Sequence, residues 1–136
     1  MFFQKNNNKK DDLSKVAALL IHAARIDENY SKIEEKIIKK ALLEIGANYE
    51  EVKVIIANGK KLEEDSNQIL DFTKEVKNME NENKIKIIET LWRIIYSNND
   101  ADIYESNLMR RLTGLLYIDN KLMGDIKEKI KKEFLK

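Results

Sequence analysis

Apolar residues recur along most of the chain at the three- and four-residue intervals of an α-helix. The first such stretch runs from about Asp12 to Arg25. Its apolar positions follow the spacing i, i+3, i+4, i+7 and are Val16, Leu19, Leu20 and Ala23. This spacing predicts an amphipathic helix that stops at an acidic turn.

Two further helices are expected before the middle of the chain. Ser31-Lys32-Ile33-Glu34 has the form of a capping box, so a helix should begin at Ser31 and end at Gly46. The residues expected on its inward face are Ile33, Ile37, Ala41 and Leu42. Asn48-Tyr49-Glu50-Glu51 repeats this start signal, and a third helix through Val52, Ile55 and Ile56 should end near Gly59.

Four more apolar stretches predict the remaining helices. Asp65 or Ser66 is expected to cap the fourth helix, the fifth runs into Ser97, and Asp102 can cap the sixth. The apolar positions of these four stretches are Ile69, Phe72 and Val76, then Ile85, Ile88, Leu91, Trp92 and Ile95, then Leu108, Met109, Leu112, Leu115 and Leu116, and finally Ile126, Ile130 and Phe134. The pattern therefore predicts about seven helices.

Composition favours a single all-α domain. The chain has 136 residues, of which 43% are hydrophobic and 36% charged, with no Pro and only four Gly. Such a sequence can bury one core and has few helix breakers. Residues 1–10 are mostly polar and are expected to form a disordered tail, which leaves residues 11–136 as the helical domain.

The charge balance excludes some partners. Lys and Arg number 25 against 24 Asp and Glu, so no net field would attract a nucleic acid backbone. No segment approaches the roughly 20 apolar residues of a membrane-spanning helix, and the absence of Cys suits a reducing compartment. We therefore expect a cytoplasmic protein.

Two acidic turns have similar sequences. RIDENYSKIEE covers residues 25–35 and SNNDADIYESN covers residues 97–107. Asp27 and Asn98 are 98 − 27 = 71 residues apart, and the same offset relates Glu34 to Glu105. This pattern predicts an internal duplication with a pseudo-two-fold axis, which would bring both turns to one end of the bundle.

Each turn carries oxygen-bearing side chains at alternate positions. These are Asp27, Asn29 and Ser31 in the first turn and Asn98, Asp100 and Asp102 in the second. The arrangement resembles the start of an EF-hand loop, but Lys32 and Ile103 stand where that loop needs Gly, and Ile38 and Met109 where it needs Glu. An EF-hand is therefore excluded.

Two interpretations of the turns remain open. Hard oxygen donors, with Glu34 and Glu105 leaning back from the following helices, suit Ca²⁺ or Mg²⁺. Alternatively, Ser31 and Asp102 are helix caps, and the carboxylates simply favour helix N-termini. The residues alone favour the second interpretation.

The chain also resembles a known family. LLIHAARIDENYSKIEEKIIKKALLEI, DFTKEV and IIETLWRIIYSNNDADIYESNLMRRLTGLL occur in the order and separation of the tellurite-resistance TerB-like family. The resemblance covers roughly Leu13 to Ile130. It implies a helical domain, a link to tellurite or chemical stress, and an acidic cation site between the two halves.

Carried over residue by residue, the resemblance implies a Ca²⁺ or Mg²⁺ site in this chain. The positions that match the family are Asp27, Glu34, Asn98, Asp102 and Glu105, and the second turn itself adds Asp100 as a sixth ligand. The chain departs from the family pattern at Glu28 and Asn99, which replace glycines, at Asn98, which replaces an aspartate, and at Asn107, where a histidine is often found. Asn98 supplies a carbonyl oxygen without the charge that helps to hold a divalent cation.

We therefore expect a non-enzymatic binding module with a protein partner, or alternatively a metal-free interaction or structural module. His22 has no Ser or Cys nucleophile beside it, so no catalytic residue is predicted. Trp92 has the spacing of a core residue. The basic C-terminal segment KEKIKKEFLK is compatible with peripheral contact with anionic lipid, but its apolar spacing favours docking on the bundle.

Overall fold

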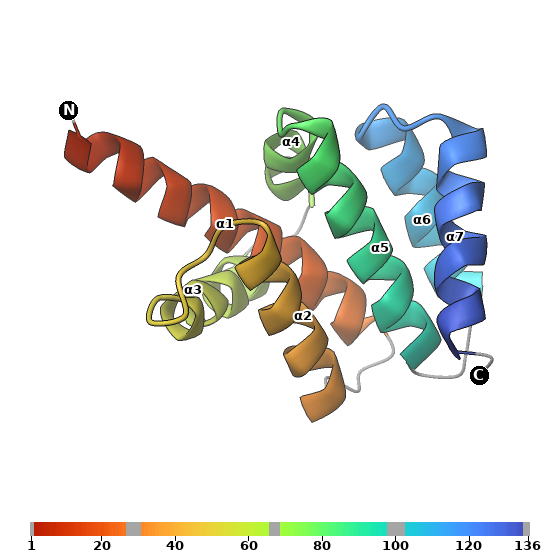
Figure 1. Cartoon of the computed structure of the whole chain (residues 1–136), viewed down its shortest axis with the longest axis horizontal. Coiled ribbons are helices and arrows are strands. Elements are labelled where there is room, and N and C mark those ends of the chain that lie inside the picture. Colours follow the sequence, from red (N-terminus) through yellow and green to blue (C-terminus); the bar gives the residue numbers. More distant parts are fainter. Residues whose placement is uncertain (1, 27–30, 66–68, 98–102, 135–136) are drawn as a thin grey trace.

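The computed structural model of the chain is an assembly of helices. It describes residues 2–26, 31–65, 69–97 and 103–134, without the side chains of 2–10 and 103–106. The described residues form seven helices and no strand, as the apolar spacing predicts (Figure 1). The helices are α1 (Phe2–Arg25), α2 (Lys32–Glu44), α3 (Val52–Asp65), α4 (Leu70–Lys77), α5 (Asn81–Ser97), α6 (Ile103–Leu115) and α7 (Asn120–Phe134).

Helices α1 and α5 form the centre of the molecule. Residues 16–21 of α1 are consecutive and buried, so this helix is covered on every side. Helix α5 buries most of its apolar side chains, including Trp92, which confirms the predicted core role of that residue. The two central helices contact each other; α2, α3, α4 and α7 pack against one or both of them, whereas α6 packs mainly against α4.

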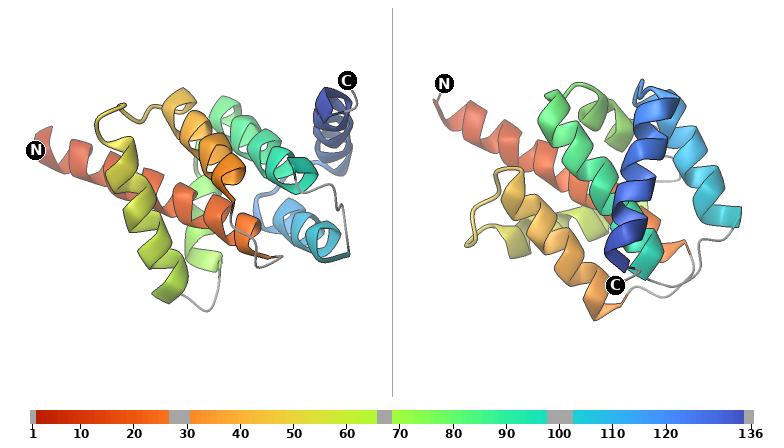
Figure 2. Two further views of the ribbon diagram at one scale, coloured as in Figure 1. Left: turned by 90° about the horizontal axis from the view of Figure 1, so that it is seen from below. Right: turned by 45° about the vertical axis from the view of Figure 1, so that its right-hand side comes forward.

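The other helices divide between the two central ones. Helix α3 packs against α1 more extensively than any other helix does, whereas α7 packs mainly against α5. Helix α2 contacts α1, α3 and α5, and α4 contacts α1, α5 and α6. Figure 2 shows α2 and α3 diverging from each other beside α1.

The predicted duplication is visible in the helix boundaries. Helix α6 begins and ends 71 residues after α2, because 103 − 32 and 115 − 44 are both 71. In each half the first helix packs mainly against the third, α1 against α3 and α5 against α7. The two halves therefore share one helical pattern.

The same duplication extends to the chain reversal after α2 and after α6. Gly46 has φ 121° and Tyr117 has φ 54°, both left-handed, and 117 − 46 is again 71. The residue after each of these donates its backbone amide to a carbonyl of the preceding helix. Ala47 bonds to the Leu42 carbonyl at 2.9 Å, and Ile118 bonds to the Thr113 carbonyl at 3.0 Å. Both helices thus end in a Schellman motif.

Two helix boundaries differ from expectation. Helix α1 begins at Phe2, about ten residues before the expected start, and includes most of the segment expected to be disordered. Its first turns project beyond the bundle in Figure 1. Helix α3 continues through Gly59 to Asp65, because Gly59 is buried against α1 and does not act as a stop signal.

The inward face of α2 also differs from expectation. Ala41 and Leu42 are buried as expected, but Ile33 is 63% exposed whereas Glu34 and Ile38 are fully buried. The first two turns of the helix are therefore rotated relative to the prediction. The expected cap of α4 is wrong as well. Asp65 is the last residue of α3, and Ile69 occupies the cap position of α4 without a side-chain hydrogen bond.

Candidate functional site

The first acidic turn lies between the end of α1 and the start of α2. At its far side Ser31 and Glu34 form the predicted capping box. The Ser31 hydroxyl accepts a hydrogen bond from the Glu34 amide at 3.1 Å, and the Glu34 carboxylate accepts one from the Ser31 amide at 2.9 Å. The Glu34 side chain is fully buried and directed back toward the turn.

The remaining predicted ligands lie outside what the structure describes. Asp27, Asn98, Asp100 and Asp102 are not among the described residues, and Glu105 belongs to α6 without a described side chain. The described side chains contain no group of three or more acidic or histidine residues that could hold a metal. Figures 1 and 2 show the last turns of α1 and α5 and the first turn of α2 toward the same end of the molecule.

An ion-pair network fixes the end of α1 that leads into the first turn. Arg25 lies 3.2 Å from the Glu63 carboxylate and 3.5 Å from that of Glu64, both near the end of α3. Glu63 is mostly shielded, with 13% of its side chain exposed, which strengthens its attraction to Arg25. The turn therefore starts from an anchored helix end.

His22 belongs to this network. Its Nδ1 atom is 4.0 Å from the Glu63 carboxylate. Burial lowers the pKa of His22 below its usual value, and the positive charge of Arg111 lowers it further, whereas Glu63 opposes the change. His22 is therefore neutral at pH 7, and its acidic neighbour is already engaged by Arg25.

The C-terminal helix is docked on the bundle. Arg93 of α5 makes two hydrogen bonds to Glu133, at 3.0 and 3.1 Å, and Lys129 lies 2.6 Å from Glu89. The ring of Phe134 lies 6.2 Å from that of Tyr96, although its side chain is 45% exposed. The docking of this segment on the bundle, which its four-residue apolar spacing favoured, is observed.

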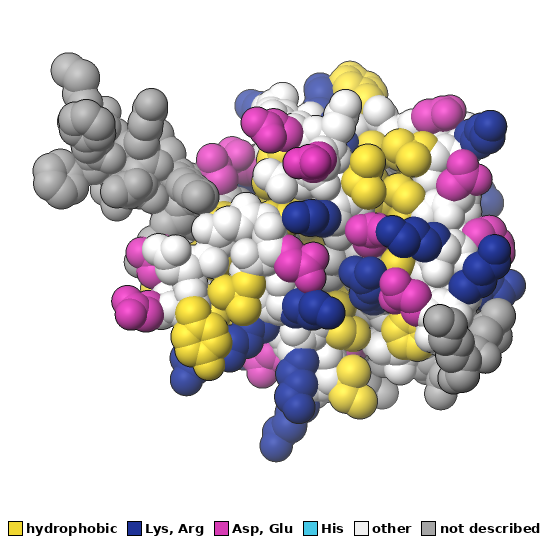
Figure 3. Space-filling view, in the orientation of Figure 1, with side chains coloured by type: hydrophobic (Ala, Val, Ile, Leu, Met, Phe, Trp, Pro, Cys, Tyr) yellow, Lys and Arg dark blue, Asp and Glu magenta, His cyan; other side chains and the backbone are white. Residues whose placement is uncertain are grey.

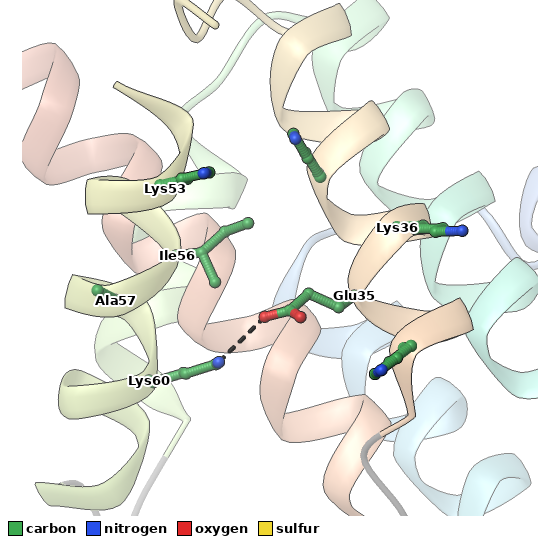
Figure 4. A pocket seen from close by; sticks show the side chains of 8 residues that line it. Glu35, Lys36, Lys53, Ile56, Ala57 and Lys60 are labelled. Carbon is green, nitrogen blue, oxygen red and sulfur yellow. Dashed lines mark hydrogen bonds and ion pairs between the residues drawn. The ribbon is translucent and has the colours of Figure 1, made fainter. Parts of the chain in front are cut away.

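A groove between α2 and α3 was missed by sequence reasoning. It has a volume of about 500 Å³ and is lined by Lys32, Glu35, Lys36, Lys39, Lys53, Ile56, Ala57 and Lys60. Figure 4 shows Lys53 and Lys60 reaching from α3 toward α2, Glu35 reaching back, and Ile56 between them. Lys60 pairs with Glu35 at 3.0 Å. We call this feature the lysine groove.

On the face of the molecule seen in Figure 3, the charges are mixed. Figure 3 shows Lys or Arg side chains interspersed with Asp or Glu side chains over the face that α5 and α7 present. Within the described ranges, no helix combines the length and apolar content needed to cross a membrane. The lysine groove differs from this face, because its lining holds five lysines and one glutamate.

Comparison with known proteins identifies a family. The family model described as tellurite resistance protein TerB matches residues 13–128. No curated protein and no solved structure shows significant similarity to the chain. The matched region includes the two acidic turns, the helices on either side of them and the lysine groove.

Proposed function

Because the chain belongs to the tellurite-resistance TerB family, we propose that it is a non-enzymatic binding module whose two acidic turns hold a divalent cation. The observation that carries the proposal is the position of Glu34. Its carboxylate is fully buried and is held toward the first turn by the Ser31 amide. A buried carboxylate at this place adds negative charge where a cation would need it.

The duplication supports a shared site. Since α2 and α6 have matching boundaries, Glu105 occupies the position in α6 that Glu34 occupies in α2. We expect Glu105 to lean toward the second turn in the same way. Asp27 from the first turn and Asn98, Asp100 and Asp102 from the second would complete a set of hard oxygen ligands.

Such a ligand set suits Ca²⁺ or Mg²⁺. Both ions prefer oxygen donors, and Ca²⁺ accepts more ligands in a less regular arrangement. The module would act by binding, since no Ser or Cys nucleophile accompanies His22 in the sequence and the Glu63 carboxylate beside it is already engaged by Arg25. The family description supports a role in tellurite resistance. We further propose that the module acts in the response to tellurite or chemical stress, with a protein partner in the cytoplasm.

A second candidate is a metal-free interaction or structural module. The capping box favours it, because Ser31 and Glu34 satisfy each other's backbone amides without any ion. In that case the twin turns serve only to start α2 and α6. Thermal unfolding separates the two candidates.

The deciding experiment compares melting temperatures in EDTA and in millimolar Ca²⁺ or Mg²⁺. A cation at about 100 times its dissociation constant should stabilise the domain by roughly 2.7 kcal/mol. Asn98→Asp should increase this response, since it adds a charged ligand, and should slightly destabilise the domain in EDTA by crowding like charges. Identical melting curves with and without cation would exclude the cation site and favour the metal-free module.

Two variants at the capping box act as matched controls. Glu34→Gln keeps an acceptor for the Ser31 amide but removes the charge, so it should weaken the cation response while leaving stability in EDTA nearly unchanged. Ser31→Ala removes the cap and should cost about 0.5 to 2 kcal/mol in either buffer. An undiminished cation response of the Glu34→Gln protein would show that Glu34 is not a ligand of the cation.

A further inference from the structure

The lysine groove has a composition that the fold does not require. It gathers five lysines and one glutamate, a net charge of +4 in a chain whose total is +1. The positions 71 residues later hold Ile103, Asn107, Arg110, Gly124 and Lys131 in place of the five lysines. The second half thus builds the same pattern of helices with only two basic residues at these positions.

Several of these lysines have no acidic partner among the described residues. Lys32, Lys36 and Lys53 make no ion pair with another residue that the structure describes, and Lys39 lies over the exposed ring of Tyr49, 4.9 Å from its centre. On α2 the lysines are one turn apart, and like charges at that distance destabilise a helix. Their grouping is explained if an external partner supplies the negative charge.

The geometry favours an elongated partner. Lys32 and Lys39 on α2 are seven residues apart, as are Lys53 and Lys60 on α3, because 39 − 32 and 60 − 53 are both 7. Seven helical residues span about 10 Å, or two turns. Each wall therefore presents positive charge over a length that a single small anion would not bridge.

The floor of the groove favours a helix. Ile56 is 6% exposed and lies between the walls (Figure 4). Ala57 also lines the groove and is exposed. Helices α2 and α3 make few contacts with each other, so the space between them is open to solvent. A partner helix could place a small apolar side chain on this floor and acidic side chains against the lysines.

We propose that the lysine groove binds an acidic amphipathic helix of a partner protein. The acidic residues of that helix would flank an apolar stripe and would repeat every seven residues, in register with both walls. The binding does not depend on a cation at the acidic turns. It is therefore tested in EDTA, so that its failure and the failure of the cation proposal are separate results.

The probe is a fluorescein-labelled helical peptide of Leu, Ala and Glu of about 18 residues, long enough to be helical. Its counterpart carries Gln in place of Glu. Fluorescence anisotropy should detect binding of the Glu peptide that weakens as salt is added, because the contacts are exposed ion pairs. The Gln peptide should bind about tenfold more weakly or not at all.

Variants of the protein locate the binding. Lys39→Glu with Lys53→Glu reverses one charge on each wall and should weaken binding about tenfold or more. Lys121→Glu with Lys132→Glu makes the same change in net charge on the exposed face of α7 and should leave binding unchanged. Ala57→Trp keeps every lysine but adds a bulky side chain to the lining of the groove, and it should also weaken binding. Circular dichroism confirms that each variant is folded.

Three results would overturn the proposal. The first is no binding of the Glu peptide at low salt. The second is equal binding by the two double variants, which would mean attraction to overall charge. The third is binding of anionic phosphatidylserine vesicles, lost on reversal of Lys39 and Lys53, with no binding of the peptide, which would assign the groove to a membrane surface.

Discussion

Gly46 and Tyr117 occupy the same place in the two halves but differ in how well they suit it. Both have left-handed backbone angles, which glycine adopts freely and a residue with a Cβ atom does not. The Tyr117 side chain is 75% exposed, and Lys77 lies 4.2 Å from the centre of its ring. This contact offsets part of the backbone strain.

Gly46→Ala should lower the free energy of unfolding by about 1 kcal/mol, because alanine strains the left-handed position. Tyr117→Gly should raise it by only about a few tenths of a kcal/mol, since it relieves strain but loses the contact with Lys77. Urea unfolding measures both. Lys77→Ala is the control, and a larger loss from Tyr117→Gly than from Lys77→Ala would contradict the strain at Tyr117.

Asp12 and Glu75 bring two carboxylates together where α1 meets α4. Burial raises the pKa of Asp12, and the charge of Glu75 raises it further, although Lys15 opposes the change. The folded chain therefore holds this proton more tightly than the unfolded chain does. The resulting stability is complete below the ordinary pKa of 3.8 and is lost as the pH rises through the raised value.

Asp12→Asn should therefore stabilise the protein at pH 7 and change little at pH 3. The gain should be only about a few tenths of a kcal/mol, since the pair is partly exposed. Urea unfolding at the two pH values tests the difference. Asp125→Asn on the exposed face of α7 controls for the removal of one charge. A gain at pH 3 as large as that at pH 7 would exclude Asp12 titration as its cause.

At the scale of elements, α1 and α3 approach each other closely at Gly59. A Cβ atom added at Gly59 would lie 2.7 Å from the Ala17 Cβ atom and 3.0 Å from the Ala18 amide nitrogen. The Ala18 nitrogen belongs to the backbone, so it cannot move away by a change of side-chain rotamer. The two helices can approach this closely only because position 59 has no side chain.

Gly59→Ala should reduce the free energy of unfolding by about 1 to 3 kcal/mol, because the helices must separate to admit the methyl group. Gly124→Ala is the matched control in α7. A Cβ atom there would meet nothing within 4 Å, so the change should stabilise the protein by about 0.5 to 1 kcal/mol. Thermal or urea unfolding of the two variants should give shifts of opposite sign.

The same elements show how far local sequence determines structure. The number and order of the helices follow from apolar spacing, but the rotation of α2 does not. Periodicity treats Glu34 as an outward residue and Ile33 as an inward one, whereas the capping box satisfies Glu34 and permits its burial. Gly59 was expected to end a helix because its intrinsic preference is weak, and packing against Ala17 overrides that preference.

The two candidate sites, the first acidic turn and the lysine groove, also differ in how far local sequence predicts them. The capping box at the first turn was predicted, because Ser31 and Glu34 are neighbours in the sequence. The lysine groove was not, because lysines on one amphipathic helix have the pattern of an ordinary solvated face. Only the packing of α2 and α3 beside α1 brings Lys39 and Lys53 to one cavity.

At the scale of the whole molecule, the two halves share a single core. Helix α5 of the second half contacts both α1 and α2 of the first. Leu20 of α1 and Leu91 of α5, which are equivalent in the duplication, are both fully buried. Neither half could expose these faces without losing much of its buried apolar surface.

The halves should therefore unfold together. Trp92, the single tryptophan of the chain, is buried in the second half and reports on that half, whereas far-ultraviolet circular dichroism reports on all helices. The two signals should give the same urea midpoint, because a shared core makes unfolding cooperative. Gly59→Ala, although it acts in the first half, should move the Trp92 midpoint by as much as the dichroism midpoint. If Gly59→Ala shifted the dichroism and left Trp92 fluorescence unchanged, the duplicated units would be separate folding domains and the shared core would have little energetic weight.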